Sequence, residues 1–238
     1  MRAIVIRATP EGAAEEAARR IARAVRAARA ERGVAHLALA GGATPRRTYE
    51  LLGPLVGDWD GIQLWFGDER AVPPEDPRSN YRMVRESLLS GARIPPEQVH
   101  RIRGELPPAE AAEAYAAELR RHVASGADGI PVLDVALLGL GEDGHTASLF
   151  PGDPLIEARG LLCRAVRAPV PPRDRVTLTL DVLCAARCVL LLAIGAGKAR
   201  AVRAVLCGPD PRVPASLLAE GATTLIADAA AAGAGEGA

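Results

Sequence analysis

The chain has 238 residues, 49% of them apolar, and its 29 basic and 29 acidic side chains cancel to a formal net charge of zero. This length suffices for a sizeable core in one large domain or two small ones, and the balanced charge argues against a nucleic-acid-binding protein, which needs a basic excess on one face. Residues 1–10 are too short and mixed for a signal peptide, and no apolar run approaches the roughly 18 residues of a membrane span, so we expect a soluble cytoplasmic protein that binds no membrane.

Strands and helices are predicted to alternate along the first half of the chain. Capping residues mark the helix ends: Gly33 as a C-cap, Thr44 as an N-cap with Pro45 at the first helical position, and Ser79 as a further N-cap. In chain order, the predicted elements are a strand over 1–7, a helix over 11–32, a strand over 34–40, a helix over 45–55, a strand over 62–66, and helices over 80–89 and 107–125.

The second half of the chain continues this alternation. Its predicted elements are strands over 132–138, 161–167, 175–180, 189–194 and 223–226, a helix from 198 to about 206 and a short helix from 217. Residues 229–238 contain only Ala, Gly and one Glu, and we expect them to fray. The order of elements predicts an α/β fold, in which a single domain over 1–228 has a mostly parallel, Rossmann-like sheet with helices on both faces and a small excursion.

The cysteines do not predict a metal site. No cysteine lies in a CxxC pair or near a histidine, as a zinc site of this kind requires. We expect free, mostly buried thiols. The cysteines are Cys163, Cys184, Cys188 and Cys207.

One loop after a predicted strand carries chemically reactive side chains. The apolar run 135–138 ends at Gly139, and Asp143 and His145 follow, two residues apart, among glycines. Open α/β sheets bind ligands in loops at the ends of central strands, and an imidazole, with a reference pKa of ~6.5, suits general-base chemistry near neutrality. We therefore interpret this loop as a chemical site.

The glycines from Gly139 to Gly144 formally match the GxGxxG pattern of dinucleotide-binding proteins. However, Glu142 and Asp143 would place carboxylates in the loop that receives the pyrophosphate, and no acidic residue follows about 20 positions later at a second strand end. A dinucleotide cofactor is therefore not predicted.

Two further glycine loops lead from a predicted strand into a helix. Residues 41–45 (Gly-Gly-Ala-Thr-Pro) offer backbone N–H groups and a hydroxyl, and residues 195–198 (Gly-Ala-Gly-Lys) include Lys198, the only lysine of the chain. Both suit a phosphate at a helix N-terminus, although the second lacks the Walker A spacing. Each loop alone is also compatible with a plain tight turn, but the two together favour a phosphate monoester.

The other charged and imidazole groups give weaker signals. Asp68, Glu69 and Arg70 directly follow a predicted strand, where a solvated turn is the simpler interpretation. The remaining histidines lie in settings that predict structural or exposed side chains; they are His36, His100 and His122.

These loops belong to longer motifs that span nearly the whole chain. The motifs are GGATP at 41–45, with Tyr49 and Leu52 beyond it, GDERAVPPEDPRSNY at 67–81, LLGLGEDGHTASLFPG at 137–152, RVTLTL at 175–180, GAGKA at 195–199 and VPAS at 213–216. Together they resemble the 6-phosphogluconolactonase family, for which DER…SNY combined with GEDGHTASLFP is specific. Ala43 departs from the family pattern, since many members have Ser there.

The resemblance implies hydrolysis of 6-phospho-D-glucono-1,5-lactone to 6-phosphogluconate, in the oxidative pentose phosphate pathway, without metal or cofactor. His145 would act as the general base toward water and later protonate the leaving ring oxygen, while Asp143 would orient it or stabilise its cation. Whether His145 or an Asp is the true base stays open. Backbone N–H groups of the 141–145 loop, with Arg70, would face the oxyanion.

The resemblance also implies a set of binding residues. Asp68 would hydrogen-bond sugar hydroxyls or tune His145. The residues expected to contact the substrate or its phosphate are Gly41, Gly42, Ala43, Thr44, Arg70, Gly141, Arg175 and Lys198. We expect the phosphosugar lactone as the partner molecule, and a monomer or small homo-oligomer.

Two alternatives stay open. The related glucosamine-6-phosphate deaminases share the glycine loop, the Asp-Glu pair and the DGH loop, but follow DGH with Phe-Asn-Glu-Pro, where this chain has Ser-Leu-Phe-Pro at 148–151. The second alternative is a non-catalytic sugar-phosphate sensor. Such regulators usually carry a helix-turn-helix, and we expect none here.

Overall fold

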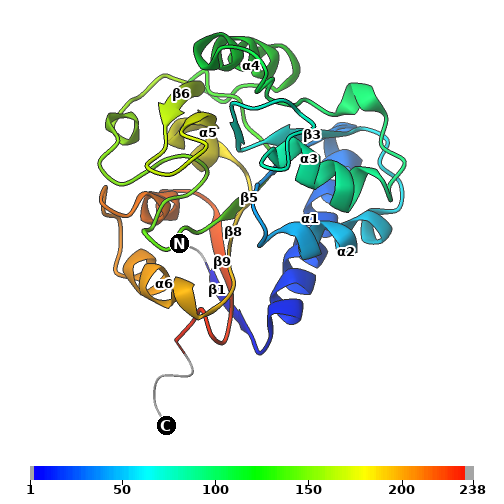
Figure 1. Ribbon diagram of the computed structural model, residues 1–238. Coiled ribbons are helices and arrows are strands. Elements are labelled where there is room, and N and C mark those ends of the chain that lie inside the picture. Colours follow the sequence, from blue (N-terminus) through cyan, green and yellow to red (C-terminus); the bar gives the residue numbers. More distant parts are fainter. Residues whose placement is uncertain (1–2, 234–238) are drawn as a thin grey trace.

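A parallel sheet of six strands forms the centre of the protein (Figure 1). The computed structural model describes residues 3–233. The strands lie in the order β1-β9-β8-β5-β2-β3, and each neighbouring pair is parallel. They are β1 (Ala3–Arg7), β2 (Ala35–Leu39), β3 (Ile62–Phe66), β5 (Val135–Gly139), β8 (Val189–Ala193) and β9 (Thr223–Asp228).

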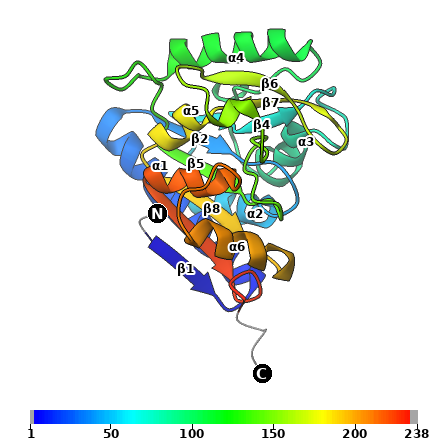
Figure 2. The same cartoon turned by 90° about the vertical axis from the view of Figure 1, so that its left-hand side faces the viewer.

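A second, smaller sheet forms the small addition to the main sheet that the sequence predicted. Its three strands are antiparallel in the order β4-β7-β6, with β4 at Asp68–Arg70, β6 at Cys163–Arg167 and β7 at Asp174–Leu178. Only Gly67 separates β3 from β4, so the small sheet begins where a strand of the large sheet ends. Figure 2 shows helix α4 (Pro108–His122) lying along this sheet.

Helices cover both faces of the large sheet, which confirms the predicted fold class. Helices α1 (Pro10–Arg32) and α2 (Arg46–Val56) pack together on one face, and α6 (Ala199–Leu206) lies on the other (Figure 1). Within residues 3–233 we find no helix that combines the length and the apolar character needed to cross a membrane. The remaining helical segments are α3 (Asn80–Val84), the π-helical η1 (Arg85–Leu89), α5 (Leu180–Ala185), and the 3-10 helices η2 (Pro96–Gln98), η3 (Pro154–Ile156), η4 (Ala196–Lys198) and η5 (Pro214–Glu220).

The strand order places a crevice beside β5. Strands β2 and β8, whose residues are all buried, flank β5 on its two sides, as expected for apolar strands covered on both faces. From β2 the chain continues outward to β3, whereas from β5 it continues in the opposite direction to β8 and β9. Open α/β sheets bind ligands at the carboxyl ends of the strands where the winding direction reverses, here between β2 and β5.

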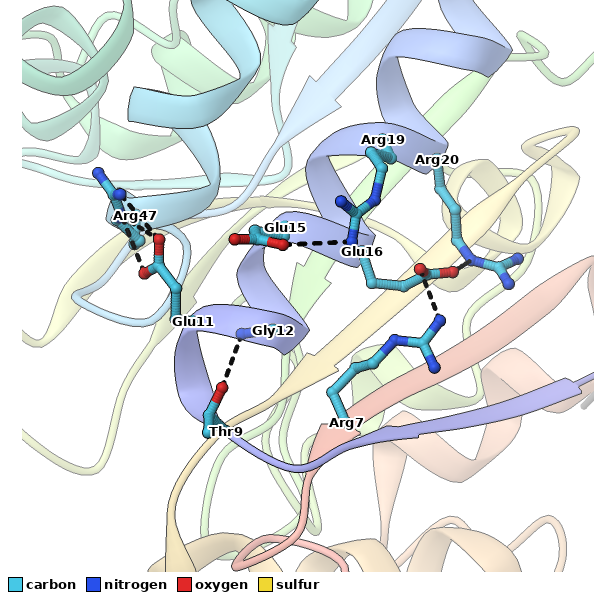
Figure 3. Close-up of polar contacts among 9 residues, drawn as sticks. All are labelled: Arg7, Thr9, Glu11, Gly12, Glu15, Glu16, Arg19, Arg20 and Arg47. Atoms are coloured by element: carbon cyan, nitrogen blue, oxygen red, sulfur yellow. Dashed lines mark hydrogen bonds and ion pairs between the residues drawn. The ribbon is translucent and has the colours of Figure 1, made fainter.

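Helix α1 shows how local sequence sets the ends of an element (Figure 3). The Gly12 N–H donates to Thr9 Oγ1 (3.0 Å) and caps the N-terminus, while Gly33 ends the helix with a left-handed φ of 77°. On the surface, the Arg47 guanidinium of α2 donates to both carboxylate oxygens of Glu11. This ion pair is exposed, so we expect it to contribute little to stability.

Helix α2 begins one residue later than predicted. The Tyr49 N–H donates to the Pro45 carbonyl (3.1 Å), which makes Pro45 the N-cap and Arg46 the first helical residue. The Thr44 hydroxyl therefore does not cap the helix and stays available in the preceding turn.

Two further assignments were wrong. Residues 68–70 form strand β4 rather than a solvated turn, because they pair with β7. The strand predicted to reach Leu180 ends at Leu178, and Leu180 begins α5, a helix that the alternating pattern concealed. The cysteines are free as expected, but only Cys163 is buried; Cys184 and Cys188 are intermediate, and Cys207 is exposed.

Part of the predicted fraying tail has a defined structure. Residues 229–233 form turns, in which the Ala231 N–H donates to Asp228 Oδ1 (2.9 Å) and the Ala231 side chain is buried. The rest of that tail, residues 234–238, and residues 1–2 of the first strand lie outside the described residues.

His36, predicted to be structural or exposed, is a buried structural histidine, and it should make stability depend on pH. Its Nδ1 accepts a hydrogen bond from Trp65 Nε1–H (3.1 Å), and burial lowers the pKa of His36 to about 4, against a partial opposing effect of Asp134. Since the unfolded value lies near 6.5, the unfolded chain binds more protons between pH 6.5 and 4. Stability therefore falls as pH is lowered through this window, by up to about 3 kcal/mol from this group.

The variant His36→Gln tests this expectation, since its amide oxygen retains an acceptor for Trp65 but does not titrate. We expect urea unfolding at several pH values from 7 to 4 to show a shallower loss of stability in the variant than in the wild type. Equal pH dependence in the two proteins would contradict the assignment.

Candidate active site

Loops from four strands of the large sheet meet at one cavity of ≈ 250 Å³. They follow β2, β3, β5 and β8 at their carboxyl ends, and the small sheet contributes Asp68 and Arg70 from β4 and Arg175 from β7. The predicted site residues that line the cavity are Gly41, Gly42, Ala43, Thr44, Asp68, Arg70, Gly141, His145, Arg175 and Lys198. Asp143 is not among the lining residues and reaches the cavity through its contact with His145.

The loop after β5 folds back on itself. The Gly141 N–H donates to the His145 carbonyl (2.8 Å), and the Gly144 N–H donates to the Gly141 carbonyl (3.1 Å). Gly144 has a φ of 89°, in the left-handed region that favours glycine. Because the N–H groups of Gly141, Gly144 and His145 donate within the loop, they are not free to face a substrate.

His145 and Asp143 form a hydrogen-bonded pair at the cavity. His145 Nδ1 lies 2.6 Å from Asp143 Oδ1, and the same oxygen accepts the His145 backbone N–H (3.1 Å). Partial burial acts to raise the pKa of Asp143, but the backbone N–H and imidazole of His145 outweigh it and hold this pKa below its usual value. Asp143 is therefore an anion at neutral pH, bonded to Nδ1, which leaves His145 Nε2 for proton transfer.

Gly141 leaves the space in which this pair forms. A Cβ at this position would lie 2.1 Å from His145 Nδ1 and 2.7 Å from Asp143 Oδ1. Both contacts are far shorter than van der Waals separations. Only glycine at position 141 is thus compatible with the observed His145–Asp143 geometry.

Asp68 is held in place by residues that our sequence analysis did not single out. Its Oδ2 accepts from Ser148 Oγ (2.6 Å), and its Oδ1 accepts from Asn80 Nδ2 (3.0 Å). A Cβ on Gly41 would lie 2.0 Å from the Asn80 amide. Ser148 and Asn80 stand within the TASLFP and SNY motifs, but no spacing rule linked them to Asp68, which lies 80 residues before Ser148.

Glu69 does not line the cavity and instead organises the nearby backbone. Its buried carboxylate accepts from the backbone N–H groups of Arg70, Asn80 and Tyr81 and from the Ser79 hydroxyl. Burial raises the pKa of Glu69 in spite of these hydrogen bonds. Glu69 therefore fixes the start of α3, which carries Asn80 toward Asp68.

Three cationic side chains line the cavity. Arg175 is buried with its guanidinium 5.8 Å from the Phe150 ring, and burial together with the nearby charge of Arg70 lowers its pKa. Arg70 Nε is buried without a hydrogen-bond partner among the described residues. Lys198 makes no ion pair within residues 3–233. A pocket with this excess of positive charge attracts an anionic ligand.

The glycine loop after β2 supplies free backbone donors. The N–H groups of Gly42, Ala43 and Thr44 donate no hydrogen bond within the part of the chain that the structure describes. Gly42 has a φ of 87°, which turns this backbone toward the cavity. Unpaired N–H groups before a helix suit a phosphate or another oxyanion.

Comparisons with known proteins agree with this arrangement. A family model described as glucosamine-6-phosphate isomerases/6-phosphogluconolactonase matches residues 8–227. The chain belongs to this family. Among family members, the 6-phosphogluconolactonase of Homo sapiens is 46% identical over 157 residues, covering 65% of this chain and 60% of the human protein. That of Streptomyces coelicolor is 38% identical over 219 residues, covering 86% of this chain and 83% of that protein.

Solved structures of the family share the fold over its full extent. The 6-phosphogluconolactonase of Trypanosoma brucei matches with a TM-score of 0.88 at 31% identity and covers 98% of both chains. A monomeric glucosamine-6-phosphate deaminase matches with a TM-score of 0.83 at 24% identity, over 97% of this chain and 99% of that chain, which establishes a common fold alone. Since one fold carries both named activities, the site must decide between them.

Proposed function

We propose that this protein hydrolyses 6-phospho-D-glucono-1,5-lactone to 6-phospho-D-gluconate. The observation that carries the proposal is the His145–Asp143 pair at a cavity that also holds three cationic side chains and free backbone donors. Relatives named 6-phosphogluconolactonase, up to 46% identical, support the same choice. We place the enzyme in the cytoplasm and in the oxidative pentose phosphate pathway.

His145 is assigned the proton transfers. Its Nε2 takes a proton from a water molecule as the water oxygen attacks the lactone carbonyl. Asp143, which is bonded to Nδ1, stabilises the imidazolium that results. The tetrahedral intermediate then expels the ring oxygen, which receives the proton from Nε2. This sequence opens the ring and leaves a carboxylic acid that ionises at neutral pH.

We assign to Arg70 the stabilisation of the negative charge that develops on the carbonyl oxygen. The N–H groups of Gly141, Gly144 and His145 are engaged within their own loop, which removes most of the donors that the sequence had suggested for this role. Arg70 lines the same cavity and has a buried, unpartnered Nε. A cation held in place at the cavity stabilises negative charge that develops in the transition state.

We assign phosphate binding to the loop after β2 together with the cationic side chains of Lys198 and Arg175. The N–H groups of residues 42–44 donate to the phosphate oxygens, and Lys198 and Arg175 neutralise its charge. Asp68, held by Ser148 and Asn80, accepts from a sugar hydroxyl. Binding of the remote phosphate positions the carbonyl for attack.

The phosphate assignment predicts a selective effect of Lys198→Ala. A hydrogen bond to a charged group is worth about 1.5–3 kcal/mol, so we expect the KM for the phosphorylated lactone to rise about tenfold or more. Hydrolysis of glucono-1,5-lactone, which has no phosphate, should be slow and equal in both proteins. The control Arg200→Ala removes an exposed cation from the first turn of the adjoining helix α6. Equal loss on both lactones would contradict the assignment.

A further inference from the structure

A second group of potential ligands lies outside the cavity, at the carboxyl end of α4. Glu118 and His122 stand four residues apart on this helix, on the same side, and His100 approaches them from the segment that follows η2. One coordinating atom of each residue lies within 4.8 Å of those of the other two. His100 is buried, Glu118 is partly exposed and His122 is exposed, so the cluster opens to solvent on one side.

His100 is held rigidly within this cluster. Its ring stacks on Trp65 with centroids 4.0 Å apart and planes at 7°. Its Nε2 lies 2.8 Å from Gln63 Oε1, and its Nδ1 lies 2.6 Å from Glu118 Oε1. Oxygen atoms therefore flank both ring nitrogens, and the Nδ1 side of the ring, with Glu118 Oε1 beside it, presents two donor atoms to a cation.

We propose that His100, Glu118 and His122 bind a divalent metal ion of the zinc class. Two imidazoles and one carboxylate form a donor set that Zn²⁺, Co²⁺ and Ni²⁺ accept, with further positions left for water. The ion would lie between His100 Nδ1, the Glu118 carboxylate and the His122 ring. Gln63 accepts from Nε2–H, as the outer partner that orients a metal-bound imidazole commonly does.

The position of the three ligands in the fold indicates a structural role for such an ion. It joins α4 to the segment after η2, two parts of the chain that already meet here through the His100–Glu118 contact and the neighbouring His100 and His122 rings. The positive charge of Arg103 acts weakly on Glu118 and reduces the attraction for a cation. None of the three residues lines the catalytic cavity, so the ion stabilises the fold and takes no part in hydrolysis.

The test is a titration of tag-free protein with Co²⁺ and Zn²⁺, in which binding is measured by calorimetry. The titration uses the His145→Ala background, so that the imidazole at the cavity does not contribute. Glu118→Gln removes the proposed ligand, and Glu113→Gln makes the same change at an exposed position of the same helix. Because loss of an outer partner already costs about 10–100-fold in metal affinity, we expect Glu118→Gln to weaken binding at least about tenfold.

The expected result is one ion per chain, a raised melting temperature with metal, and unchanged affinity in Glu113→Gln. His122→Ala, a second exposed substitution, should weaken binding as Glu118→Gln does. Absence of one-to-one binding, or equal affinity in Glu118→Gln and Glu113→Gln, would overturn the proposal. Neither outcome bears on the proposed lactonase activity, which is measured separately.

Discussion

Replacing His145 by alanine should lower kcat for the phosphorylated lactone by about 10²–10⁴-fold, the usual contribution of a positioned general base. His145 joins the cavity to the Asp143 carboxylate through its Nδ1, and its loss removes both proton transfers. The fold should survive, because the side chain is only partly buried. The measurement is initial acid release at constant pH, corrected for the spontaneous hydrolysis of the lactone.

The same prediction extends to Asp143→Asn. An amide at this position keeps the size of the side chain but not the charge that favours the imidazolium, so we expect a large fall in kcat with little change in KM. The control Asp128→Asn makes the identical change in an exposed loop and should behave as the wild type. If His145→Ala or Asp143→Asn retained the wild-type kcat, another group would have to be the base.

Gly141→Ala should lower kcat to a similar extent although both members of the pair remain present. The added methyl group would lie 2.1 Å from His145 Nδ1, so the imidazole must rotate away from Asp143. A displacement of about 1 Å at a catalytic group can cost about 10²-fold in rate. The measurement is kcat beside the melting temperature, which separates a displaced imidazole from an unfolded protein.

Gly53→Ala is the matched control for this substitution. A Cβ at Gly53 would make only ordinary van der Waals contacts, the shortest at 3.8 Å, and the residue lies within α2, away from the cavity. We expect it to keep full activity. Full activity of Gly141→Ala would mean that the observed pair is not the geometry in which the enzyme works.

The sequence predicted the fold class because its apolar runs are strong signals. Strands such as β8, with residues 189–193 all buried, are continuous apolar segments between glycine or charged residues. It failed at positions 68–70 and 180 because short strands and helices are fixed by tertiary pairing rather than by local pattern. The strand order, which creates the crevice beside β5, also has no local signature.

The site was predictable where chemistry is concentrated in one loop. Asp143 and His145 stand two residues apart, and glycine loops mark the phosphate-binding candidates. Contacts between distant segments were not predictable, such as the bonds of Asp68 to Ser148 and Asn80. The use of loop N–H groups for internal hydrogen bonds was likewise visible only in three dimensions, and for this reason we propose Arg70 rather than the 141–145 backbone for the oxyanion.

The most direct test of the central proposal is acid release from freshly prepared 6-phospho-D-glucono-1,5-lactone by the wild-type protein, against a blank without enzyme. We predict release far above the blank, lost in His145→Ala, and no ammonia release from glucosamine 6-phosphate. Release equal to the blank, with 6-phosphogluconate still bound in the cavity, would contradict the proposal and leave a sugar-phosphate sensor.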